Sequence, residues 1–145
     1  MTPQGLQRLI QDEGSRPQPY DDKTGLTIHL GPAGGNVTIG VGRNLTARPL
    51  TQAEIEYLLQ NDLAEDWAWL TEHDPSLTPL YNTVFGDVVE MVDFNTGNAL
   101  GFPKMIAAML AGDAETAAQE CAVSNPRLAE RYGRMQAAIR AGSWG

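Results

Sequence analysis

The chain has 145 residues, of which 42% are hydrophobic and 19% charged, and its formal net charge is −8. This length is typical of one domain that buries a core without disulfides. The single cysteine, Cys121, excludes an internal disulfide framework and is expected to be a buried thiol. No apolar run approaches the roughly 20 residues that span a bilayer. The excess of acid argues against nucleic-acid binding, which depends on clustered lysine and arginine.

The first expected element is a helix over residues 3–13, because Leu6, Leu9 and Ile10 share one helical face. Gly14 is a natural end for it. Prolines and glycines then separate short apolar runs as far as residue 42. LTIHL (26–30) and NVTIGVG (36–42) flank GPAGG, which predicts two strands joined by a glycine-rich turn.

From Thr51 onwards the pattern is helical. TQAE predicts a capping box between Thr51 and Glu54 at the start of a helix over residues 52–71. Further helix boundaries are indicated by Gly97 as a C-cap and by Pro103, Asp113 and Pro126 as helix starts. The predicted fold is a single α+β domain over residues 1–145. A small N-terminal sheet lobe (about 14–50) is linked by helix 52–71 to a larger helical lobe (about 72–145 plus 3–13).

Several kinds of site are not expected. His29 and His73 do not have the spacing of metal ligands, so no metal site is predicted. GPAGG lacks the ending of a phosphate-binding loop, and no nucleophile elbow is present. The tryptophans are expected to be packing residues rather than a ligand box: Trp67, Trp69 and Trp144. No cofactor is expected, which leaves the carboxylates as candidates.

Two carboxylates stand close to the predicted first turn. Glu13 ends the first helix, and Asp22 follows after two prolines and a tyrosine, with Asp21 beside it. Two acids carried by different elements can face one cleft, and glycoside hydrolysis needs such a pair, one protonated and one ionised. On spacing alone, the simpler interpretation is favoured: Glu13 is a surface acid at a helix end and Asp22 is a turn former.

A resemblance favours the catalytic interpretation. DEG, PYDD and TIGVGRNLT, followed by LLQNDL, MVDFNTGNALGFPKMIAAMLAGD, AAQE and AIRAGSW, occur in this order over nearly the whole chain. The combination resembles the phage-type lysozymes, the glycoside hydrolase family that includes the T-even phage enzyme. It implies a lysozyme-like fold and a muramidase that hydrolyses the β-1,4 bond between N-acetylmuramic acid and N-acetylglucosamine in bacterial peptidoglycan.

The resemblance also implies catalytic roles. Glu13 corresponds to the general acid and Asp22, by its spacing, to the second carboxylate. Thr38 opens the TIGVG segment and corresponds to a threonine that orients the attacking water. Thr38 lies further along the chain than the family pattern has it, so LTIHLGPAGG is interpreted as an insertion; Thr27 is nearer but lacks the following Ile-Gly. Inversion at the anomeric carbon is expected, with carboxyl groups roughly 6.5–9.5 Å apart rather than about 5 Å.

Further positions follow from the same resemblance. Arg131 corresponds to an arginine that pairs with the catalytic acid, although a solvated helix residue fits the sequence equally well. Arg43 and Asp62 correspond to an ion pair between the sheet lobe and the connecting helix. The expected substrate contacts are Phe94, Asn95, Asn44 and Glu120. Phe94 can equally be a core residue, whereas an amide such as Asn95 on an apolar helix face needs hydrogen-bonding partners.

The expected partner is bacterial peptidoglycan, and neither nucleic-acid binding, membrane insertion nor oligomerisation is expected. The polar N-terminus does not resemble a secretory signal. The protein is therefore expected to be made in the cytoplasm of the host as a monomer and to reach the wall through a holin or within a virion. Its acidity is unfavourable near an anionic wall, but arginines near the C-terminus can form a local basic face: Arg127, Arg131, Arg134 and Arg140.

Two alternatives remain open. The chain can be a catalytically inactive peptidoglycan-binding or structural domain that keeps the lysozyme fold, because a fold does not guarantee an activity. It can also be a lytic transglycosylase, which cleaves the same bond without water and leaves an anhydro product.

Overall fold

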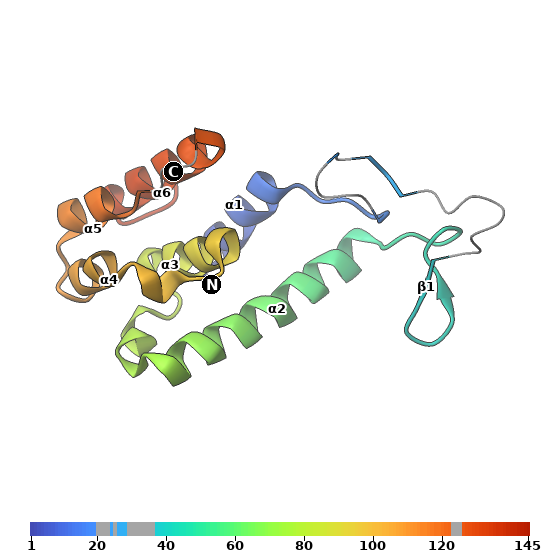
Figure 1. The fold of residues 1–145 in the computed structure, drawn as a ribbon, viewed down its shortest axis with the longest axis horizontal. Coiled ribbons are helices and arrows are strands. Elements are labelled where there is room, and N and C mark those ends of the chain that lie inside the picture. Colours follow the sequence, from blue (N-terminus) through green and yellow to red (C-terminus); the bar gives the residue numbers. More distant parts are fainter. Residues whose placement is uncertain (20–23, 25, 29–36, 123–125) are drawn as a thin grey trace. The chain divides into compact units, whose positions relative to one another are not determined.

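The computed structural model describes residues 1–19, 24, 26–28, 37–122 and 126–145 (Figure 1). They are mostly helical with one two-stranded antiparallel sheet, which agrees with the predicted α+β class. The chain divides into two compact units. The larger comprises Met1–Glu13 and Asp62–Gly145, and the smaller is Gly14–Asn61. The division falls inside the helix that was expected to connect two lobes, so that helix contributes its first part to one unit and its second part to the other.

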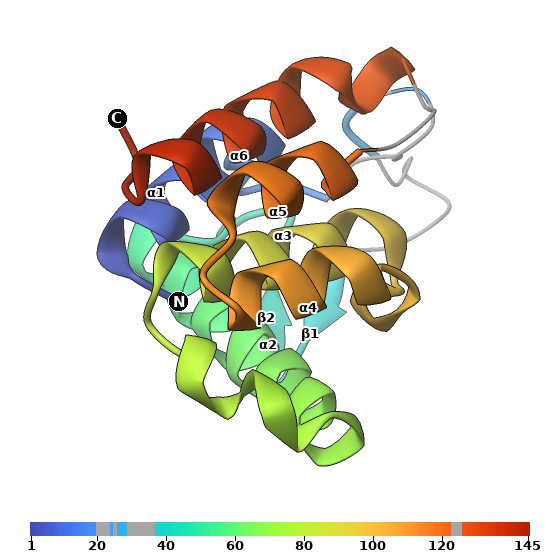
Figure 2. The ribbon, with the colours of Figure 1, turned by 90° about the vertical axis from the view of Figure 1, so that its left-hand side faces the viewer.

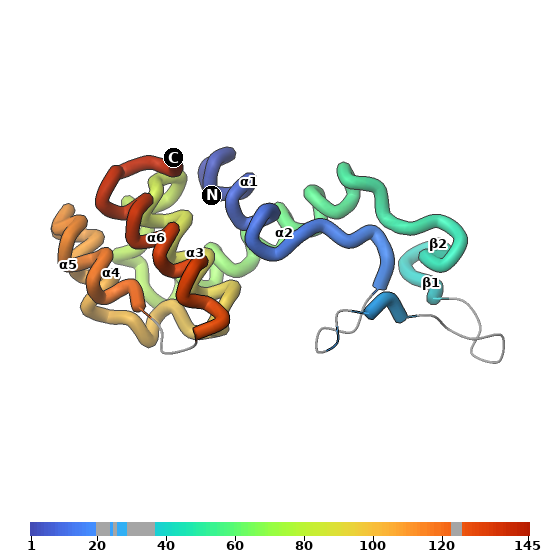
Figure 3. The backbone as a smooth tube through the Cα atoms, turned by 90° about the horizontal axis from the view of Figure 1, so that it is seen from above, coloured from blue at the N-terminus to red at the C-terminus, as the bar shows by residue number. Residues whose placement is uncertain are grey.

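The smaller unit holds the sheet. Strand β1 (Thr38–Ile39) pairs with β2 (Arg43–Asn44), and the register sets Thr38 opposite Asn44. The chain turns back between these two strands (Figure 3). The prediction of one continuous strand over residues 36–42 is therefore wrong. Gly40 and Gly42 have φ angles of 55° and 68°, a left-handed conformation that favours glycine and makes the turn. The last two residues of the expected partner strand, 29 and 30, and the GPAGG turn lie outside the described residues.

Helix α2 (Gln52–His73) begins as the capping-box prediction has it. The Thr51 backbone N–H donates to Glu54 Oε2 over 2.8 Å, and the Glu54 N–H donates to Thr51 Oγ1 over 3.3 Å. The two residues thus satisfy each other's otherwise unpaired donors at the helix start. The start at residue 52 is confirmed, and the helix runs two residues past the predicted end.

The larger unit contains the other α-helices. They are α1 (Pro3–Glu13), α3 (Val84–Thr96), α4 (Pro103–Leu110), α5 (Ala114–Glu120) and α6 (Ala129–Ala141). Short 3₁₀ helices connect them: η1 (Pro75–Leu80), η2 (Ala99–Gly101) and η3 (Pro126–Leu128). The predicted boundaries at Gly97, Pro103 and Asp113 are confirmed, whereas Pro126 opens η3 and α6 begins at Ala129. Gly97 ends α3 at φ 65°, Pro103 opens α4, and Asp113 accepts a hydrogen bond from the Thr116 N–H over 3.1 Å.

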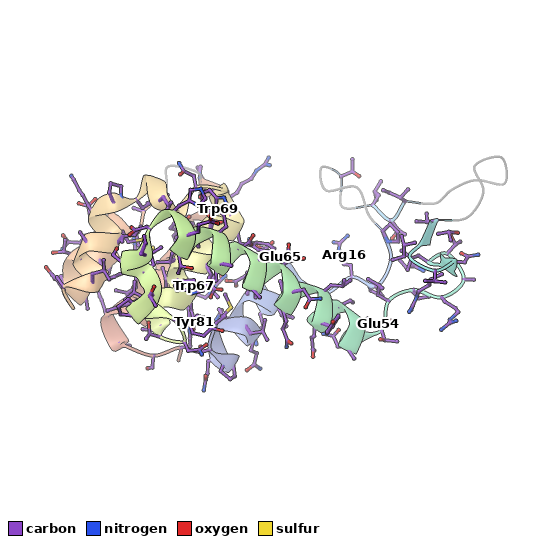
Figure 4. All side chains as sticks on the ribbon, turned by 90° about the horizontal axis from the view of Figure 1, so that it is seen from below. Arg16, Glu54, Glu65, Trp67, Trp69 and Tyr81 are labelled. Atoms are coloured by element: carbon purple, nitrogen blue, oxygen red, sulfur yellow. The ribbon has the colours of Figure 1, made fainter. Side chains whose placement is uncertain are left out.

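Helix α3 supplies much of the core of the larger unit. It contacts α1 and α6, while α5 lies beside both α4 and α6 (Figure 2). Buried aliphatic side chains of α3 include Val88, Val89, Met91 and Val92. Trp67 is buried and its ring centroid lies 5.6 Å from that of Tyr81 (Figure 4). Cys121 is buried as predicted, and burial raises the pKa of its thiol to about 12.

A buried carboxylate of α3, Asp87, accepts hydrogen bonds from both ends of the chain. The Thr2 backbone N–H donates to Asp87 Oδ1 over 2.7 Å, and the Trp144 indole Nε1–H donates to Oδ2 over 2.8 Å. The Thr2 hydroxyl also bonds Oδ2. A Cβ at Gly5 would collide with this carboxylate, so α1 comes this close because residue 5 is glycine. Asp87 thus fixes α1 and the segment after α6 on α3.

Glu90, one helical turn along α3, is also buried, and its carboxylate lies 3.4 Å from the α-amino group of Met1. Burial raises the pKa of Glu90 from its ordinary value of 4.5 to about 7, and this outweighs the opposing effect of the amino group. Between pH 4.5 and about 7, the Glu90 carboxyl group is protonated in the folded state but ionised in the unfolded chain. The free energy of unfolding therefore falls as the pH rises through this window.

We expect Glu90→Gln, which cannot ionise, to remove this pH dependence. Between pH 5 and 8 the wild type should lose roughly 2–3 kcal/mol of stability relative to the variant. Urea unfolding at several pH values measures the difference. Glu72→Gln, at an exposed position of α2, is the control and should keep the wild-type slope. A parallel pH dependence of wild type and Glu90→Gln would contradict the assignment.

Candidate functional site

Glu13 is the last residue of α1 and belongs to the larger unit. The helix ends there because Gly14 adopts a φ of 79°, which turns the chain away from the helical path. The Glu13 side chain is 31% exposed. The local sequence therefore places a partly accessible carboxylate at the end of a helix whose opposite end is held by Asp87.

Arg131 of α6 connects Glu13 to two other segments of the larger unit. Its Nη1 forms an ion pair with Glu13 Oε1 and donates to Asn95 Oδ1 over 2.9 Å. Its Nη2 donates to the backbone carbonyl of Asp12 over 2.6 Å. Three of the predicted site residues, carried by α1, α3 and α6, are thus brought together. The alternative of a solvated Arg131 without a partner does not describe the structure.

Asn95 has its amide held within the protein. Its Nδ2 donates to the Met91 carbonyl over 2.6 Å, which turns Oδ1 toward Arg131. The expected need for partners is met in this way, and the second Nδ2 hydrogen has no acceptor among the described residues. The neighbouring Phe94 is 42% exposed, so it is not a pure core residue.

A second ion pair, which the sequence interpretation missed, stabilises the same helix end. Arg134 Nη2 lies 2.5 Å from Asp12 Oδ1, and Arg134 Nη1 lies 2.6 Å from Glu130. Arg131 and Arg134 are one turn apart on α6 and meet consecutive acids at the end of α1. Paired arginines at helical spacing and paired acids at a helix end were the available signal. Together they hold the backbone carbonyl and side chain of Asp12 as well as the side chain of Glu13.

The other predicted catalytic residues are not part of this described cluster. Asp22 and its rival Asp21 lie outside the described residues, so the expected carboxyl separation stays a prediction. Thr38 is exposed on β1 of the smaller unit, and the rival Thr27 is exposed as well.

The remaining predicted residues have local partners. Asn44 Oδ1 accepts from the backbone N–H groups of Thr46 and Ala47, at 2.9 and 3.1 Å, which stabilises the turn after β2. Glu120 is exposed and lies 4.0 Å from the Lys104 amine. Both side chains therefore have a structural interaction of their own.

Arg43 differs from its predicted pairing. Its guanidinium forms an ion pair with Glu54, not with Asp62, and donates to the Pro49 carbonyl over 2.7 Å. Asp62 is exposed and belongs to the larger unit. The pKa of Glu54 is lowered to about 2, first by the Thr51 backbone N–H and then by the hydrogen bond from Arg43. The capping box therefore positions the Glu54 carboxylate where Arg43 can pair with it.

The described residues were compared with the requirements of a metal site and of a membrane-spanning helix. Among them, no group of three or more histidine, cysteine, aspartate or glutamate side chains could hold a metal ion. None of the described helices is both long and apolar enough to span a bilayer.

Comparison with known proteins provides no relative for this chain. No protein-family model matches the sequence, and no match is found among curated proteins or solved structures. A partly exposed carboxylate with a fixed guanidinium on one oxygen can exchange a proton with a ligand through the other.

Proposed function

We propose that this protein is a muramidase of the phage lysozyme type, which hydrolyses the β-1,4 bond between N-acetylmuramic acid and N-acetylglucosamine in bacterial peptidoglycan. The observation that supports this most is the contact of Arg131 with both Glu13 and Asn95. It joins residues from three helices around a partly exposed carboxylate. The sequence resemblance assigns these same positions to the general acid, its arginine partner and a residue lining the cleft.

The geometry suits a general acid at Glu13. Arg131 engages Oε1, and no hydrogen bond within the described residues involves Oε2. Oε2 is thus the oxygen that can carry a proton toward the glycosidic oxygen of a bound sugar. Because Arg131 also donates to Asn95 and to the Asp12 carbonyl, the guanidinium keeps its place whether Glu13 is neutral or ionised.

The charge that develops in the reaction also has a partner. When Glu13 gives its proton to the leaving oxygen, it becomes a carboxylate beside a cation that is already in position. Such preorganised charge stabilises the transition state without reorganisation. The proposal gives Asp22 the role of activating a water on the opposite face of the sugar, with Thr38 orienting that water. Attack from the opposite face inverts the anomeric carbon.

Product analysis tests the reaction type. The wild type should clear a suspension of purified peptidoglycan and release fragments with new reducing ends, whose mass includes one added water. Proton NMR of the first product should show the inverted anomer. Anhydro products would instead establish the transglycosylase alternative. Binding to peptidoglycan with no clearing would favour the non-catalytic alternative and overturn the proposal.

A further inference from the structure

Three hollows on the larger unit share one residue, Trp144. Their volumes are about 580, 240 and 210 Å³. The largest and smallest hollows share Gln4 as well as Trp144, and the two smaller ones share Arg8. They therefore adjoin around the indole ring. We refer to this surface as the Trp144 groove, and its lining on the α1 side is Gln4, Gln7, Arg8 and Gln11.

The indole ring in this groove is held in a fixed position. Trp144 Nε1 donates over 2.8 Å to Oδ2 of Asp87, a carboxylate that is 0% exposed. The ring itself is only partly buried. The sequence predicts a packing residue, but complete burial would serve packing better than an anchored ring beside three hollows. A rigid aromatic surface binds a ligand with little loss of conformational entropy.

The α1 side of the groove is a row of amides with one cation. Gln4, Gln7, Arg8 and Gln11 are spaced i, i+3, i+4 and i+7, so they share one helical face. No hydrogen bond or ion pair formed by these four side chains occurs within the described part of the chain. The opposite face of α1 carries the buried Leu9. Glu13 is four residues further along the helix and therefore lies on that same opposite face. The row of glutamines therefore faces away from Glu13, and the groove approaches the Glu13 cluster through Arg134, which pairs with Asp12.

We propose that the Trp144 groove is a second, non-catalytic saccharide site that takes a chain of acylamino sugars. The C–H face of a pyranose ring can pack on the indole, which gains dispersion and buries apolar surface. Each glutamine amide offers donors and an acceptor, which match sugar hydroxyl and acetamido groups. Arg8 can pair with a carboxylate attached to such a chain.

Other ligand classes fit this lining less well. Phosphate polymers and nucleic acids need clustered cations, whereas Arg134, the second arginine of the groove, already pairs with Asp12 and Glu130. An apolar peptide would leave the row of glutamines without partners. A saccharide site would also hold the protein on a polymeric glycan and raise the local concentration of substrate. Arg8 would supply local attraction on a chain of net charge −8.

Heteronuclear NMR on the Glu13→Gln variant, which should consume the probe at least about 10²-fold more slowly than the wild type, tests the site directly. The probe is the N-acetylglucosamine tetramer, and the readout is the indole N–H signal of each tryptophan. The Trp144 signal should shift in a saturable manner. Trp69, which is 49% exposed and stacks on His73, is the matched control and should not shift. A Trp144 signal that stays in place at saturating tetramer would overturn the proposal.

Surface variants separate binding from folding. Gln7→Ala combined with Gln11→Ala, and Arg8→Gln alone, should each weaken binding of purified peptidoglycan to the Glu13→Gln variant by about tenfold. The controls Gln119→Ala and Arg48→Gln remove one amide and one guanidinium at exposed positions that do not line the groove, and should change the affinity less than twofold. Equal losses in groove and control variants would count against the site. Hydrolysis by the chain with Glu13 intact is a separate readout, so failure here leaves the proposed reaction untouched.

Discussion

Replacing Glu13 with glutamine is expected to lower the initial rate of peptidoglycan clearing by roughly 10²–10⁴-fold, which is what a general acid typically contributes. Glutamine keeps the size of the side chain and retains an oxygen for Arg131. Its amide cannot deliver a proton to the glycosidic oxygen. Because the Glu13 side chain is partly exposed, the loss of the ion pair should cost only about 1 kcal/mol of stability or less.

The control for this variant is Glu72→Gln, which makes the same chemical change at an exposed position of α2. It should clear peptidoglycan at the wild-type rate. Rates are compared at equal concentrations of folded protein, with circular dichroism confirming the helical content of each variant. If Glu13→Gln and Glu72→Gln clear equally fast, Glu13 is not the general acid.

Asp87→Ala is expected to destabilise the protein by roughly 3 kcal/mol or more. The carboxylate accepts from the Thr2 N–H, the Thr2 hydroxyl and the Trp144 indole, and each stranded buried donor costs about 1–3 kcal/mol. The hydroxyl can rotate to find water, so the three costs do not add in full. Urea unfolding, followed by circular dichroism, measures the free energy of unfolding.

Two further variants provide comparisons for the stability of Asp87→Ala. Asp87→Asn keeps one carbonyl oxygen and should be less destabilised than Asp87→Ala. Glu65→Ala removes an exposed acid from α2 and should change the free energy of unfolding by about 0.5 kcal/mol or less. An Asp87→Ala protein as stable as Glu65→Ala would mean that the Asp87 hydrogen bonds contribute nothing net to the fold.

The helices were predictable because their ends are decided by neighbouring residues. The Thr51–Glu54 capping box, the left-handed Gly97 and the Asp113 cap each satisfy backbone groups within a few positions. The prediction of one strand over residues 36–42 failed for a related reason. The alternating pattern of residues 36–42 suggested one strand, but Gly40 and Gly42 have the left-handed conformation that a tight turn requires.

The contacts of the candidate site depend on tertiary packing, so residues alone did not predict them. Glu13 and Arg131 are 118 positions apart, and only the resemblance paired them. The Arg43 prediction failed because Glu54, held by its own helix cap, is the partner in the structure. Asp87 was missed, although an acid inside the apolar run VFGDVVEMV signals a buried carboxylate that needs donors.

The double attachment at Asp87 has a consequence for biosynthesis. One donor to this carboxylate comes from residue 2 and another from residue 144. During synthesis by the ribosome, the larger unit cannot complete this arrangement until residue 144 has left the exit tunnel. The smaller unit, Gly14–Asn61, is continuous in sequence and meets no such delay. The larger unit therefore completes its native contacts only after the whole of the smaller unit has been synthesised.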